Sequence, residues 1–283
     1  MPSVLITGCS RGIGLTTALI LGRAGYNVFA TMRDPQRSSQ LAEEARKGNL
    51  PIHVSAMDVT SDDSVRNGIA SIQKSNGPID VLVNNAGIER TGSVEELPMS
   101  DVRDLMETNF FGPARCIQAV MPEMRKRRSG CIINVSSVAG RISSPPMTMY
   151  AASKYALEAM SEGLAQEAKM FNIRVVIVEP GVINTDMAQR VAGMKGKSPS
   201  NIYPHEHRMA QLFSVSLQTP TSPTVVGEKI REIIESGSWK FRYPVGPDAE
   251  GYLQWRASMT DEQWVALGAV DEETWRRSLT AGQ

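Results

Sequence analysis

Near its start the chain reads Val4-Leu5-Ile6-Thr7-Gly8-Cys9-Ser10-Arg11-Gly12-Ile13-Gly14, an apolar run that leads directly into glycines spaced GxxxGxG. The run is typical of a buried strand, and the apolar spacing from Ile13 onward predicts a helix that ends near Gly25. Glycines at a strand-to-helix turn let the backbone bend sharply and approach a pyrophosphate, which the free N–H groups of the helix N-terminus attract. Because a second apolar strand, Val28–Met32, follows, we interpret the stretch as a nucleotide-binding turn rather than an ordinary tight turn.

Strand and helix signals alternate along the rest of the chain. The expected strands are Val4–Thr7, Val28–Met32, Ile52–Ala56, Ile79–Asn84, Cys131–Val135, Arg174–Val178 and Phe241–Val245. The expected helices after the first are Ser38–Lys47, Asp62–Lys74, Asp101–Arg127, Tyr150–Phe171 and Thr224–Glu235. Continuously apolar strands separated by helices indicate an α/β fold, a doubly wound parallel seven-stranded sheet with helices on both faces. Ligands of such folds bind at the carboxyl ends of the strands.

The pattern changes after Pro180-Gly181. Residues 182–222 carry glycines and prolines among methionines, which predicts a long irregular segment whose apolar content suits a lid over a substrate cleft. We expect one catalytic, dinucleotide-binding domain at 1–246 that includes this lid, followed by a helical C-terminal extension at 247–283.

The C-terminal extension carries Trp255, Trp264 and Trp275 in three expected short helical pieces, and Thr260 with Gln263 fits a capping box. Such tryptophans either line a substrate cleft or anchor a tail onto its own domain or a partner subunit. The anchoring role is the more common of the two, so it is the one we expect.

The chain has 30 basic and 30 acidic residues, so its formal net charge is zero and nothing indicates a nucleic-acid or acidic membrane partner. Cys9, Cys116 and Cys131 lack disulfide or metal-ligand spacing, which fits a reducing compartment; Cys9, in the glycine turn, is the one expected to be open to oxidation. No apolar run approaches the ~20 residues of a membrane span. The first strand starts almost at Met1, so we expect a cytoplasmic protein without a signal peptide.

Tyr150-Ala-Ala-Ser-Lys154 places a phenol and an ammonium one turn apart on the same helix face. An ammonium beside a phenol favours the ionised form, so we expect the pKa of Tyr150 to fall from ~10 toward neutrality. Such a phenol can exchange the proton that interconverts a carbonyl and an alcohol, and Ser137, upstream, can hydrogen-bond the same oxygen. The YxxxK spacing alone is common, and it gains weight because the glycine-rich turn stands in the same chain.

Five motifs stand in the order and spacing of one family: Thr7-Gly8-xxx-Gly12-x-Gly14, Asn84-Asn85-Ala86-Gly87, Ser137, Tyr150-xxx-Lys154 and Pro180-Gly181. Over residues 3–245 the chain resembles the short-chain dehydrogenase/reductases, and among them the single-domain, NADP-preferring members similar to hydroxysteroid and retinol dehydrogenases. The resemblance implies a Rossmann-type fold and oxidoreductase activity.

In that family the tyrosine is the general acid/base, which the resemblance transfers to Tyr150. It likewise implies that Ser137 hydrogen-bonds the reacting oxygen and that Lys154 lowers the tyrosine pKa and holds the nicotinamide ribose. Asn109 stands where the family has an asparagine that orders a water chain to the lysine. By composition alone Asn109 could instead be a polar residue that disturbs a helix before Gly112-Pro113.

The glycine-rich turn and the resemblance together imply a set of dinucleotide contacts. Asp58 resembles the carboxylate that accepts a hydrogen bond from the adenine amino group, although it could be a simple turn or helix-start aspartate. Residues just after Pro180-Gly181 resemble the segment that meets the nicotinamide carboxamide. The implied cofactor residues are Gly8, Ser10, Arg11, Gly12, Ile13, Gly14, Arg33, Asp58, Asn85, Ala86, Gly87, Tyr150, Lys154, Pro180, Gly181, Ile183 and Thr185.

The end of the second strand decides between NAD(H) and NADP(H). Enzymes that use NAD place an acidic residue there to bind the ribose 2′-OH, and that carboxylate repels a 2′-phosphate. Met32 occupies the place, and Arg33 beside it can bind a phosphate with two hydrogen bonds. Arg11 offers a second cation, whereas Asp34 lies two positions late for the acidic role. We therefore expect NADP(H).

The expected reaction is reversible hydride transfer between NADP(H) and the carbonyl carbon of a medium-sized, largely apolar ketone or secondary alcohol, a small-molecule substrate. We expect its pocket from Ile88–Arg90, Arg141–Met147, Val182 and a lid at 187–213, which carry few charges. Epimerases and dehydratases of this fold have longer chains and a GxxGxxG turn, and enoyl reductases separate the tyrosine and lysine by six residues. The remaining alternative is a non-catalytic NADP(H)-binding sensor or scaffold protein, which would not need an intact Ser–Tyr–Lys set.

Two further features concern metals and assembly. His205-Glu206-His207 would share a face as alternate residues of a strand, but no further ligand cluster accompanies them, so we expect no metal site. Helices 101–127 and 150–171 correspond to those that form a four-helix dimer interface in family relatives. With Met121, Met124, Met160 and Leu164 on their exposed faces, they suggest a homodimer or homotetramer.

Overall fold

The computed structural model describes residues 1–37, 39–194, 202–203, 205–271, 273–275 and 277. Its centre is a parallel sheet of seven strands in the order β3-β2-β1-β4-β5-β6-β7. The strands are β1 (Ser3–Thr7), β2 (Asn27–Met32), β3 (Ile52–Ala56), β4 (Val81–Asn84), β5 (Gly130–Val135), β6 (Ile173–Pro180) and β7 (Arg242–Val245). The predicted doubly wound, Rossmann-type α/β fold is confirmed. Its strand order reverses between β1 and β4, the place where such folds bind ligands.

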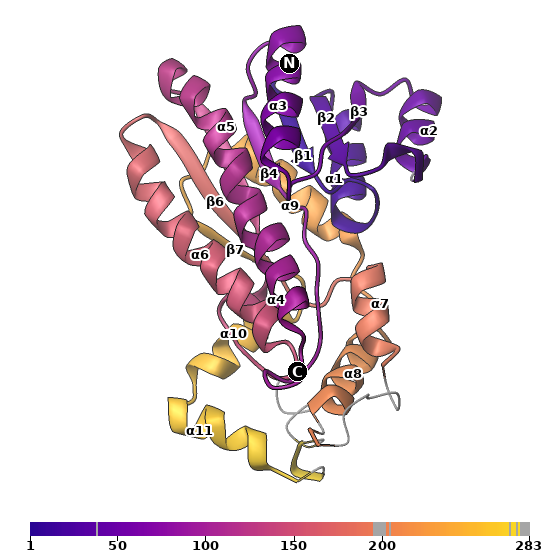
Figure 1. The fold of residues 1–283 in the computed structure, drawn as a ribbon, viewed down its shortest axis with the longest axis vertical. Helices are drawn as coiled ribbons and strands as arrows, with labels where there is room; N and C mark the ends of the chain where they lie inside the picture. Colours follow the sequence, from indigo (N-terminus) through magenta and orange to yellow (C-terminus); the bar gives the residue numbers. More distant parts are fainter. Residues whose placement is uncertain (38, 195–201, 204, 272, 276, 278–283) are drawn as a thin grey trace.

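Helices cover both faces of this sheet (Figure 1). The α-helices are α1 (Gly12–Arg23), α2 (Gln40–Lys47), α3 (Asp62–Asn76), α4 (Met99–Met106), α5 (Gly112–Arg127), α6 (Thr148–Lys169), α7 (Asp186–Ala192), α8 (His205–Ser216), α9 (Pro223–Ser236), α10 (Ala249–Ala257) and α11 (Asp261–Ala266). The short turns are η1 (Pro35–Arg37), η3 (Val138–Gly140), η4 (Leu267–Ala269) and the π-helical η2 (Glu107–Phe111).

Successive side chains of each strand point to opposite faces of the sheet, and each face has its own hydrophobic layer. Val4 and Ile6 of β1 belong to the layer that packs against α1 and α9. Leu5, between them, belongs to the layer under α3, α5 and α6. All three side chains are fully buried. Burial on both faces explains why these strands are apolar throughout rather than alternating.

The helix predicted at Asp101–Arg127 is interrupted in the structure. It consists of α4, the π-helical turn η2 and α5 in direct succession. Single π-helical turns inside helices occur frequently at functional sites. Asn109 lies in this turn, so the interruption coincides with one of the predicted catalytic residues.

The predicted irregular segment 182–222 contains two helices in its described part, so that prediction was wrong in part. The glycines and prolines of the segment lie far enough apart to allow two helices, α7 of 7 residues and α8 of 12 residues. His205 and His207 start α8, and residues two apart on a helix point to different sides, unlike the strand considered for a metal site. Gly196, Pro199 and Pro204 lie outside the described residues.

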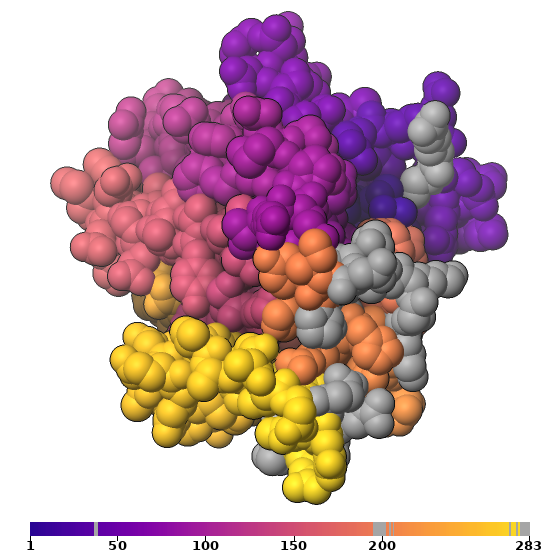
Figure 2. All heavy atoms as spheres, turned by 60° about the horizontal axis from the view of Figure 1, so that its bottom comes forward, coloured from indigo at the N-terminus to yellow at the C-terminus, as the bar shows by residue number. Residues whose placement is uncertain are grey.

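The C-terminal extension folds back beside α7 and α8. Thr260 and Gln263 form the predicted capping box at the start of α11. Arg208 of α8 donates a hydrogen bond to the carbonyl oxygen of Val270 at 2.6 Å, and its guanidinium lies 5.6 Å from the centre of the Trp275 ring. Figures 1 and 2 show the yellow extension and the orange α7–α8 segment gathered at the same end of the molecule.

Two expectations about exposed side chains were wrong. Met124 and Leu164 are buried in the layer under α3, α5 and α6, and Met121 and Met160 pack against it, because they complete the apolar faces of their helices toward the sheet. Cys9 is fully buried and donates to the carbonyl oxygen of Ile6 at 3.3 Å. Burial raises the pKa of this thiol, so it is not poised for oxidation. Within the described ranges, no helix has the length and apolar character that crossing a membrane requires.

Candidate active site

A cavity of about 1350 Å³ opens at the carboxyl ends of the strands. The glycine-rich turn and the strand ends line one part of it, and α7, α8 and the C-terminal extension line the other. The predicted site residues in this lining are Gly8, Ser10, Arg11, Gly12, Ile13, Arg33, Asp58, Asn85, Ala86, Gly87, Ser137, Tyr150, Lys154, Pro180, Gly181, Ile183 and Thr185. Small-molecule pockets measure roughly 300–1,000 Å³, so this cavity has room for a dinucleotide and a second ligand.

The glycine-rich turn is fixed by close backbone packing. Gly8 has a φ of +73°, and a Cβ added there would lie 2.7 Å from the Cα of Ala86. The Thr7 hydroxyl accepts hydrogen bonds from the N–H groups of Asn85 (3.1 Å) and Ala86 (3.0 Å), and the Asn85 amide donates to the Thr7 carbonyl at 2.9 Å. A Cβ on Gly14 would collide with the Asn85 amide, so Gly14 serves this packing and does not line the cavity. The glycine-rich turn and the Asn84-Asn85-Ala86-Gly87 motif therefore fix each other in position.

The same turn leaves an anion site open. Helix α1 begins at Gly12, with a φ of +58°, and its first turn has no side-chain cap. The N–H groups of an uncapped first turn attract a phosphate, and the adjoining glycines keep side chains out of its way. A dinucleotide pyrophosphate fits this place.

The end of β2 presents a cation to the cavity. Arg33 is exposed and lines the cavity, whereas the adjacent Asp34 does not. The Asp34 carboxylate accepts a hydrogen bond from the N–H of Gln36 at 3.0 Å. Arg11, the second predicted cation, also lines the cavity and pairs with Asp186 at 3.4 Å, both side chains being largely exposed.

Asp58 is a turn aspartate that also reaches the cavity. Its carboxylate accepts hydrogen bonds from the N–H (3.0 Å) and the hydroxyl (2.8 Å) of Thr60, which makes it a turn aspartate. Asp58 also lines the cavity, at the end opposite α8 and the extension. A turn that fixes the carboxylate leaves its other oxygen available to a ligand amino group.

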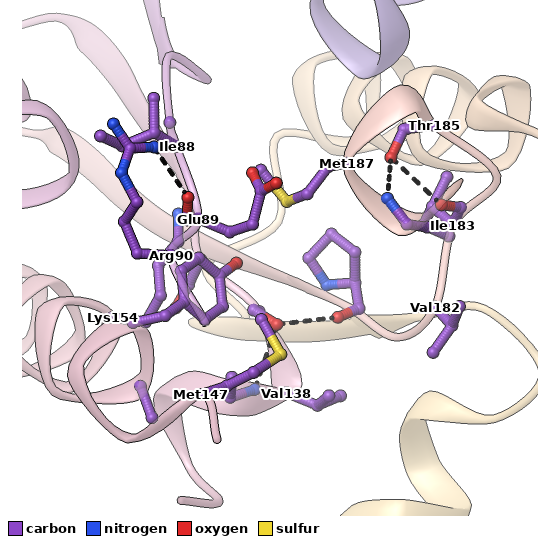
Figure 3. Close-up of a pocket in the computed structure, with 18 of the residues that line it drawn as sticks. Ile88, Glu89, Arg90, Val138, Met147, Lys154, Val182, Ile183, Thr185 and Met187 are labelled. Atoms are coloured by element: carbon purple, nitrogen blue, oxygen red, sulfur yellow. Dashed lines mark hydrogen bonds between the residues drawn. The ribbon is translucent and has the colours of Figure 1, made fainter. Parts of the chain in front are cut away.

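Tyr150 and Lys154 are both buried at the start of α6, and both line the cavity. The Lys154 ammonium donates to the carbonyl oxygen of Val135 at 2.9 Å, and its nitrogen lies 5.9 Å from the centre of the Tyr150 ring. Ser137 is held by two backbone contacts, accepting from the N–H of Ala139 at 3.1 Å and donating to Pro180 at 3.4 Å. Figure 3 shows Lys154 and Met147 across the cavity from Ile183 and Thr185.

Burial dominates the acidities of this pair. It raises the pKa of Tyr150 to about 12, although a hydrogen bond with Ser137 lowers it, and Glu89 raises it further. Burial also lowers the pKa of Lys154 to about 8, and the charge of Glu158 opposes that shift. The expectation that the pKa of Tyr150 falls toward neutrality was therefore wrong, because burial and the charge of Glu89 raise this pKa more than the hydrogen bond with Ser137 lowers it.

Asn109 lies behind the cavity surface rather than in it. Its amide donates to the Ile88 carbonyl (2.9 Å) and the Ser153 hydroxyl (3.0 Å), and its oxygen accepts from the Ile88 N–H at 2.9 Å. A Cβ on Gly87 would lie 3.4 Å from the Asn109 oxygen and 3.7 Å from the Lys154 ammonium. Both the Asn109 amide and the Lys154 ammonium therefore lie close to Gly87.

The substrate side of the cavity carries more charge than the sequence suggested. Glu89, only 9% exposed, forms two hydrogen bonds with the Arg190 guanidinium, at 3.0 and 3.1 Å. Arg90 pairs with Asp101 at 3.2 Å. Both ion pairs tie the segment after β4 to neighbouring helices, so the expectation of few charges was wrong. The charges of these two ion pairs are internally compensated. The apolar lining residues on this side are Ile142, Pro145, Met147, Val182, Met187, Met209, Leu212 and Phe213, and Ser143, Ser144, His205 and Arg208 lie among them.

The three tryptophans of the extension line this side of the cavity, in addition to the anchoring role that we expected. Trp255 and Trp264 meet edge to face, with ring centres 5.2 Å apart. The Trp264 N–H donates to the carbonyl oxygen of Ser143, in the segment that precedes Tyr150, at 3.1 Å. Anchoring and lining are therefore performed by the same side chains.

Asp248 is a site residue that the sequence did not reveal. It precedes α10, and its carboxylate accepts a hydrogen bond from the N–H of Val182 at 2.8 Å. A Cβ on Gly181 would collide with the same carboxylate. Burial raises the pKa of Asp248. The extension thus fixes the backbone just after Pro180, and only the proximity of Gly246 and Asp248 to a strand end could have suggested it.

The similarity of this chain to known proteins identifies its family. The family model described as short chain dehydrogenase matches residues 2–196. The chain belongs to the short-chain dehydrogenase family. It is 33% identical over 271 residues to Oxidoreductase BOA17 of Botryotinia fuckeliana, covering 93% of this chain and 96% of that protein.

Solved structures agree with this membership. A short-chain dehydrogenase from Streptomyces avermitilis is 32% identical, with a TM-score of 0.79 and coverage of 95% of this chain and 99% of that one. The structure of ElxO with NADP bound is 27% identical, with a TM-score of 0.71 and coverage of 86% and 96%. The predicted family is confirmed, and the protein is an oxidoreductase of that family, acting on CH–OH or C=O groups.

Proposed function

We propose that the protein is an NADP(H)-dependent oxidoreductase that interconverts a largely apolar ketone and its secondary alcohol, with Tyr150 as general acid and base. The observation that carries the proposal is that Ser137, Tyr150 and Lys154 line the same cavity as the glycine-rich turn. A dinucleotide bound at that turn extends along the strand ends toward the tyrosine.

Tyr150, Ser137 and Lys154 each have a separate role in carbonyl reduction. NADPH, when bound, supplies the hydride that forms the new C–H bond. Tyr150 donates its phenolic proton to the carbonyl oxygen, and the Ser137 hydroxyl holds that oxygen by a hydrogen bond. The Lys154 ammonium stabilises the tyrosinate that remains until solvent returns a proton to it. In alcohol oxidation Tyr150 removes the same proton. With its pKa raised to about 12 by burial, the resting phenol carries the proton that carbonyl reduction requires.

The preference for NADP(H) rests on the end of β2. Arg33 offers an exposed guanidinium to the cavity, and its planar donors match a 2′-phosphate. Asp34, the residue that would favour NAD(H), lies outside the lining, with its carboxylate engaged by Gln36. The structural relative ElxO holds NADP, which supports the same choice.

The substrate end favours an apolar molecule. Met147 before α6, Met187 of α7 and Met209 of α8 line the cavity together with Trp255 and Trp264 of the extension. Methionine side chains adapt their shape to a ligand, and tryptophans bury a large apolar area. A carbonyl compound with an apolar or ring-bearing body fits such walls better than a charged sugar phosphate.

The test is a fluorescence titration of the purified protein with NADPH and NADH, using wild type, Arg33→Ala and Arg46→Ala. Arg46 is an exposed arginine of α2 that does not line the cavity, so it is the matched control. We expect NADPH to bind at least about tenfold more tightly than NADH, and the preference to disappear only in Arg33→Ala.

Tighter binding of NADH would contradict the cofactor assignment and indicate that Asp34 binds the 2′-OH of the ribose. If NADPH binds but no carbonyl compound is reduced, the alternative of a non-catalytic sensor or scaffold gains support. Binding of neither nucleotide would contradict both functions.

A further inference from the structure

The segment that joins β6 to α7 forms one wall of the cavity. Val182, Ile183 and Thr185 of this segment line the cavity, and Figure 3 shows Ile183 and Thr185 across from Lys154. The segment is the one expected to meet the nicotinamide, so its position decides how the reactive end of a dinucleotide lies. The contacts that hold its backbone therefore bear on the chemistry.

Three hydrogen bonds fix the backbone of this segment. The N–H of Gly181 donates to a carbonyl oxygen of β7 at 2.9 Å, and the N–H of Asn184 donates to the carbonyl oxygen of Thr221 at 2.9 Å. Between them, the N–H of Val182 donates to a side chain, the carboxylate of Asp248, at 2.8 Å. Because Val182 is buried, removal of this carboxylate would deprive a buried N–H of its acceptor, which costs free energy unless the backbone moves.

Asp248 stands at the N-cap of α10, where an aspartate side chain ordinarily accepts a hydrogen bond from its own helix. In the described part of the chain its carboxylate makes no such cap and binds the N–H of Val182 instead. Its second oxygen is buried and has no hydrogen-bond partner among the described residues. An unfilled cap and an unsatisfied acceptor both cost stability, so the segment that Asp248 holds explains its placement better than the stability of α10 does.

Two glycines fit closely around this carboxylate. A Cβ added to Gly181 would collide with it, and a Cβ added to Gly246 would lie 2.9 Å from its Oδ1. Gly246 also has a φ of +110°, a backbone conformation that glycine adopts readily and other residues rarely do. A carboxylate enclosed in this way has little freedom to move, so it holds Val182 in one place.

We propose that Asp248 is a positioning residue that holds Val182 and its neighbours where the nicotinamide half of NADP(H) binds. The inference rests on the proposed function and deepens it, since it gives the C-terminal extension a part in cofactor binding. Asp248 is not among the described residues that line the cavity, so it acts on the cofactor only through the backbone of this segment. The adenine half, which binds at the glycine-rich turn and Arg33, does not depend on Asp248.

Calorimetric titration with two ligands separates the position of the nicotinamide from nucleotide binding in general. The ligands are NADPH and 2′-phospho-ADP-ribose, which lacks the nicotinamide. In Asp248→Ala we expect the Kd of NADPH to rise about 5–20-fold, and the Kd of 2′-phospho-ADP-ribose to stay within about twofold of wild type. Glu250→Ala is the matched control, since Glu250 is an exposed carboxylate in the first turn of α10. Both of its dissociation constants should match wild type.

Two further variants keep the result decisive. Asp248→Asn keeps an acceptor oxygen at the same reach and should restore most of the affinity for NADPH. If Asp248→Ala does not fold, Asp248→Ser supplies a favourable N-cap residue for α10, but its shorter side chain does not reach Val182, so NADPH binding should still weaken. In the ligand-free protein, the amide of Val182 should exchange its hydrogen at least about tenfold faster in Asp248→Ala or Asp248→Ser than in wild type.

The outcomes distinguish this inference from the proposed function. A folded Asp248→Ala or Asp248→Ser in which both dissociation constants change by the same factor, or neither changes, overturns the positioning role, even where the Val182 amide exchanges faster. The proposed function stands in that case, because wild type still binds NADPH. If wild type binds NADPH but reduces no carbonyl compound, the proposed function fails, while the two dissociation constants still decide the role of Asp248. If wild type binds neither ligand, both fail.

Discussion

The two ends of the cavity are built in different ways. At the dinucleotide end, Gly8 packs against the backbone of Ala86, and Gly14 packs against the Gly8 carbonyl and the side-chain amide of Asn85, so a single added Cβ would collide with a neighbour. At the substrate end, α7, α8 and the extension come from residues after 180 and are joined by side chains, such as Arg208 on Val270 and Trp264 on Ser143. The first end tolerates almost no change in residue type, and the second is free to vary in shape.

The largest effect is expected from Tyr150→Phe, at the place where the two ends of the cavity meet. Removing the phenolic hydroxyl removes the proton donor, so kcat for ketone reduction should fall by about 10³-fold, within the range known for general acid catalysis. Tyr155→Phe, at a half-exposed position of the same helix, should leave kcat nearly unchanged. Steady-state kinetics with NADPH check both variants. Equal loss in the two would mean that the hydroxyl of Tyr150 has no special role.

The rigidity of the dinucleotide end predicts a large loss of stability in Gly8→Ala. The positive φ of +73° and the collision with Ala86 should lower the free energy of unfolding by about 2–4 kcal/mol and abolish nucleotide binding. Gly163→Ala is the control, because Gly163 lies within α6 with no atom near the added Cβ. It should stabilise the protein by up to about 1 kcal/mol. Urea unfolding distinguishes them, and a harmless Gly8→Ala would refute the account of this turn.

The buried charge of Lys154 should lower the free energy of unfolding at neutral pH. Its pKa of about 8 lies below the ordinary 10.5, so the unfolded chain binds the proton more strongly between these values. Lys154→Met should therefore raise the free energy of unfolding by about 1–3 kcal/mol at pH 7. That gain should shrink as the pH rises from 8 to 10.5, because over this range Lys154 is neutral in the folded protein and still protonated in the unfolded chain.

Urea unfolding of wild type and Lys154→Met at pH 7 and pH 10 checks this dependence. The exposed Lys126 provides the control, since Lys126→Met should change stability little at either pH. A Lys154→Met protein that is less stable than wild type at pH 7 would show that the hydrogen bond to Val135 outweighs the burial of the ammonium.

Substitutions at the substrate end should have smaller effects, and these should be confined to substrate binding. Trp264→Leu removes the ring that contacts Trp255 and the N–H that holds Ser143, so KM for an apolar ketone should rise about 5–10-fold. The dissociation constant of NADPH should not change. Trp239→Leu is the control, since Trp239 is 46% exposed and does not line the cavity. A Trp264→Leu enzyme with unchanged KM but weakened NADPH binding would reverse the assignment of the two ends.

The contrast between the ends also explains how far the sequence could predict the molecule. The seven strands and the glycine turn were predictable because they depend on residue type and local spacing: glycines at forced backbone positions and apolar runs buried on both faces. The tyrosine, serine and lysine were found from a fixed spacing in the same way, and the structure brings them into one cavity.

What the sequence missed depends on packing between distant segments. The irregular pattern of 182–222 concealed α7 and α8, whose stability comes from contact with each other. The tail tryptophans could not be assigned to the cavity without knowing that α10 and α11 return to the strand ends. The direction of the Tyr150 pKa shift was missed because the sequence shows neither the burial of the phenol nor the nearby Glu89 carboxylate, and both raise its pKa.

The measurement that tests the central claim most directly follows the hydride itself. Wild type and Tyr150→Phe are each given NADPH carrying deuterium at the transferred position of C4, with a panel of apolar ketones, and the alcohol product is examined by mass spectrometry. The account predicts deuterium on the carbinol carbon with wild type and almost no product with Tyr150→Phe, which should still bind NADPH. NADPH binding by both proteins with no labelled alcohol from either, or full product formation by Tyr150→Phe, would contradict it.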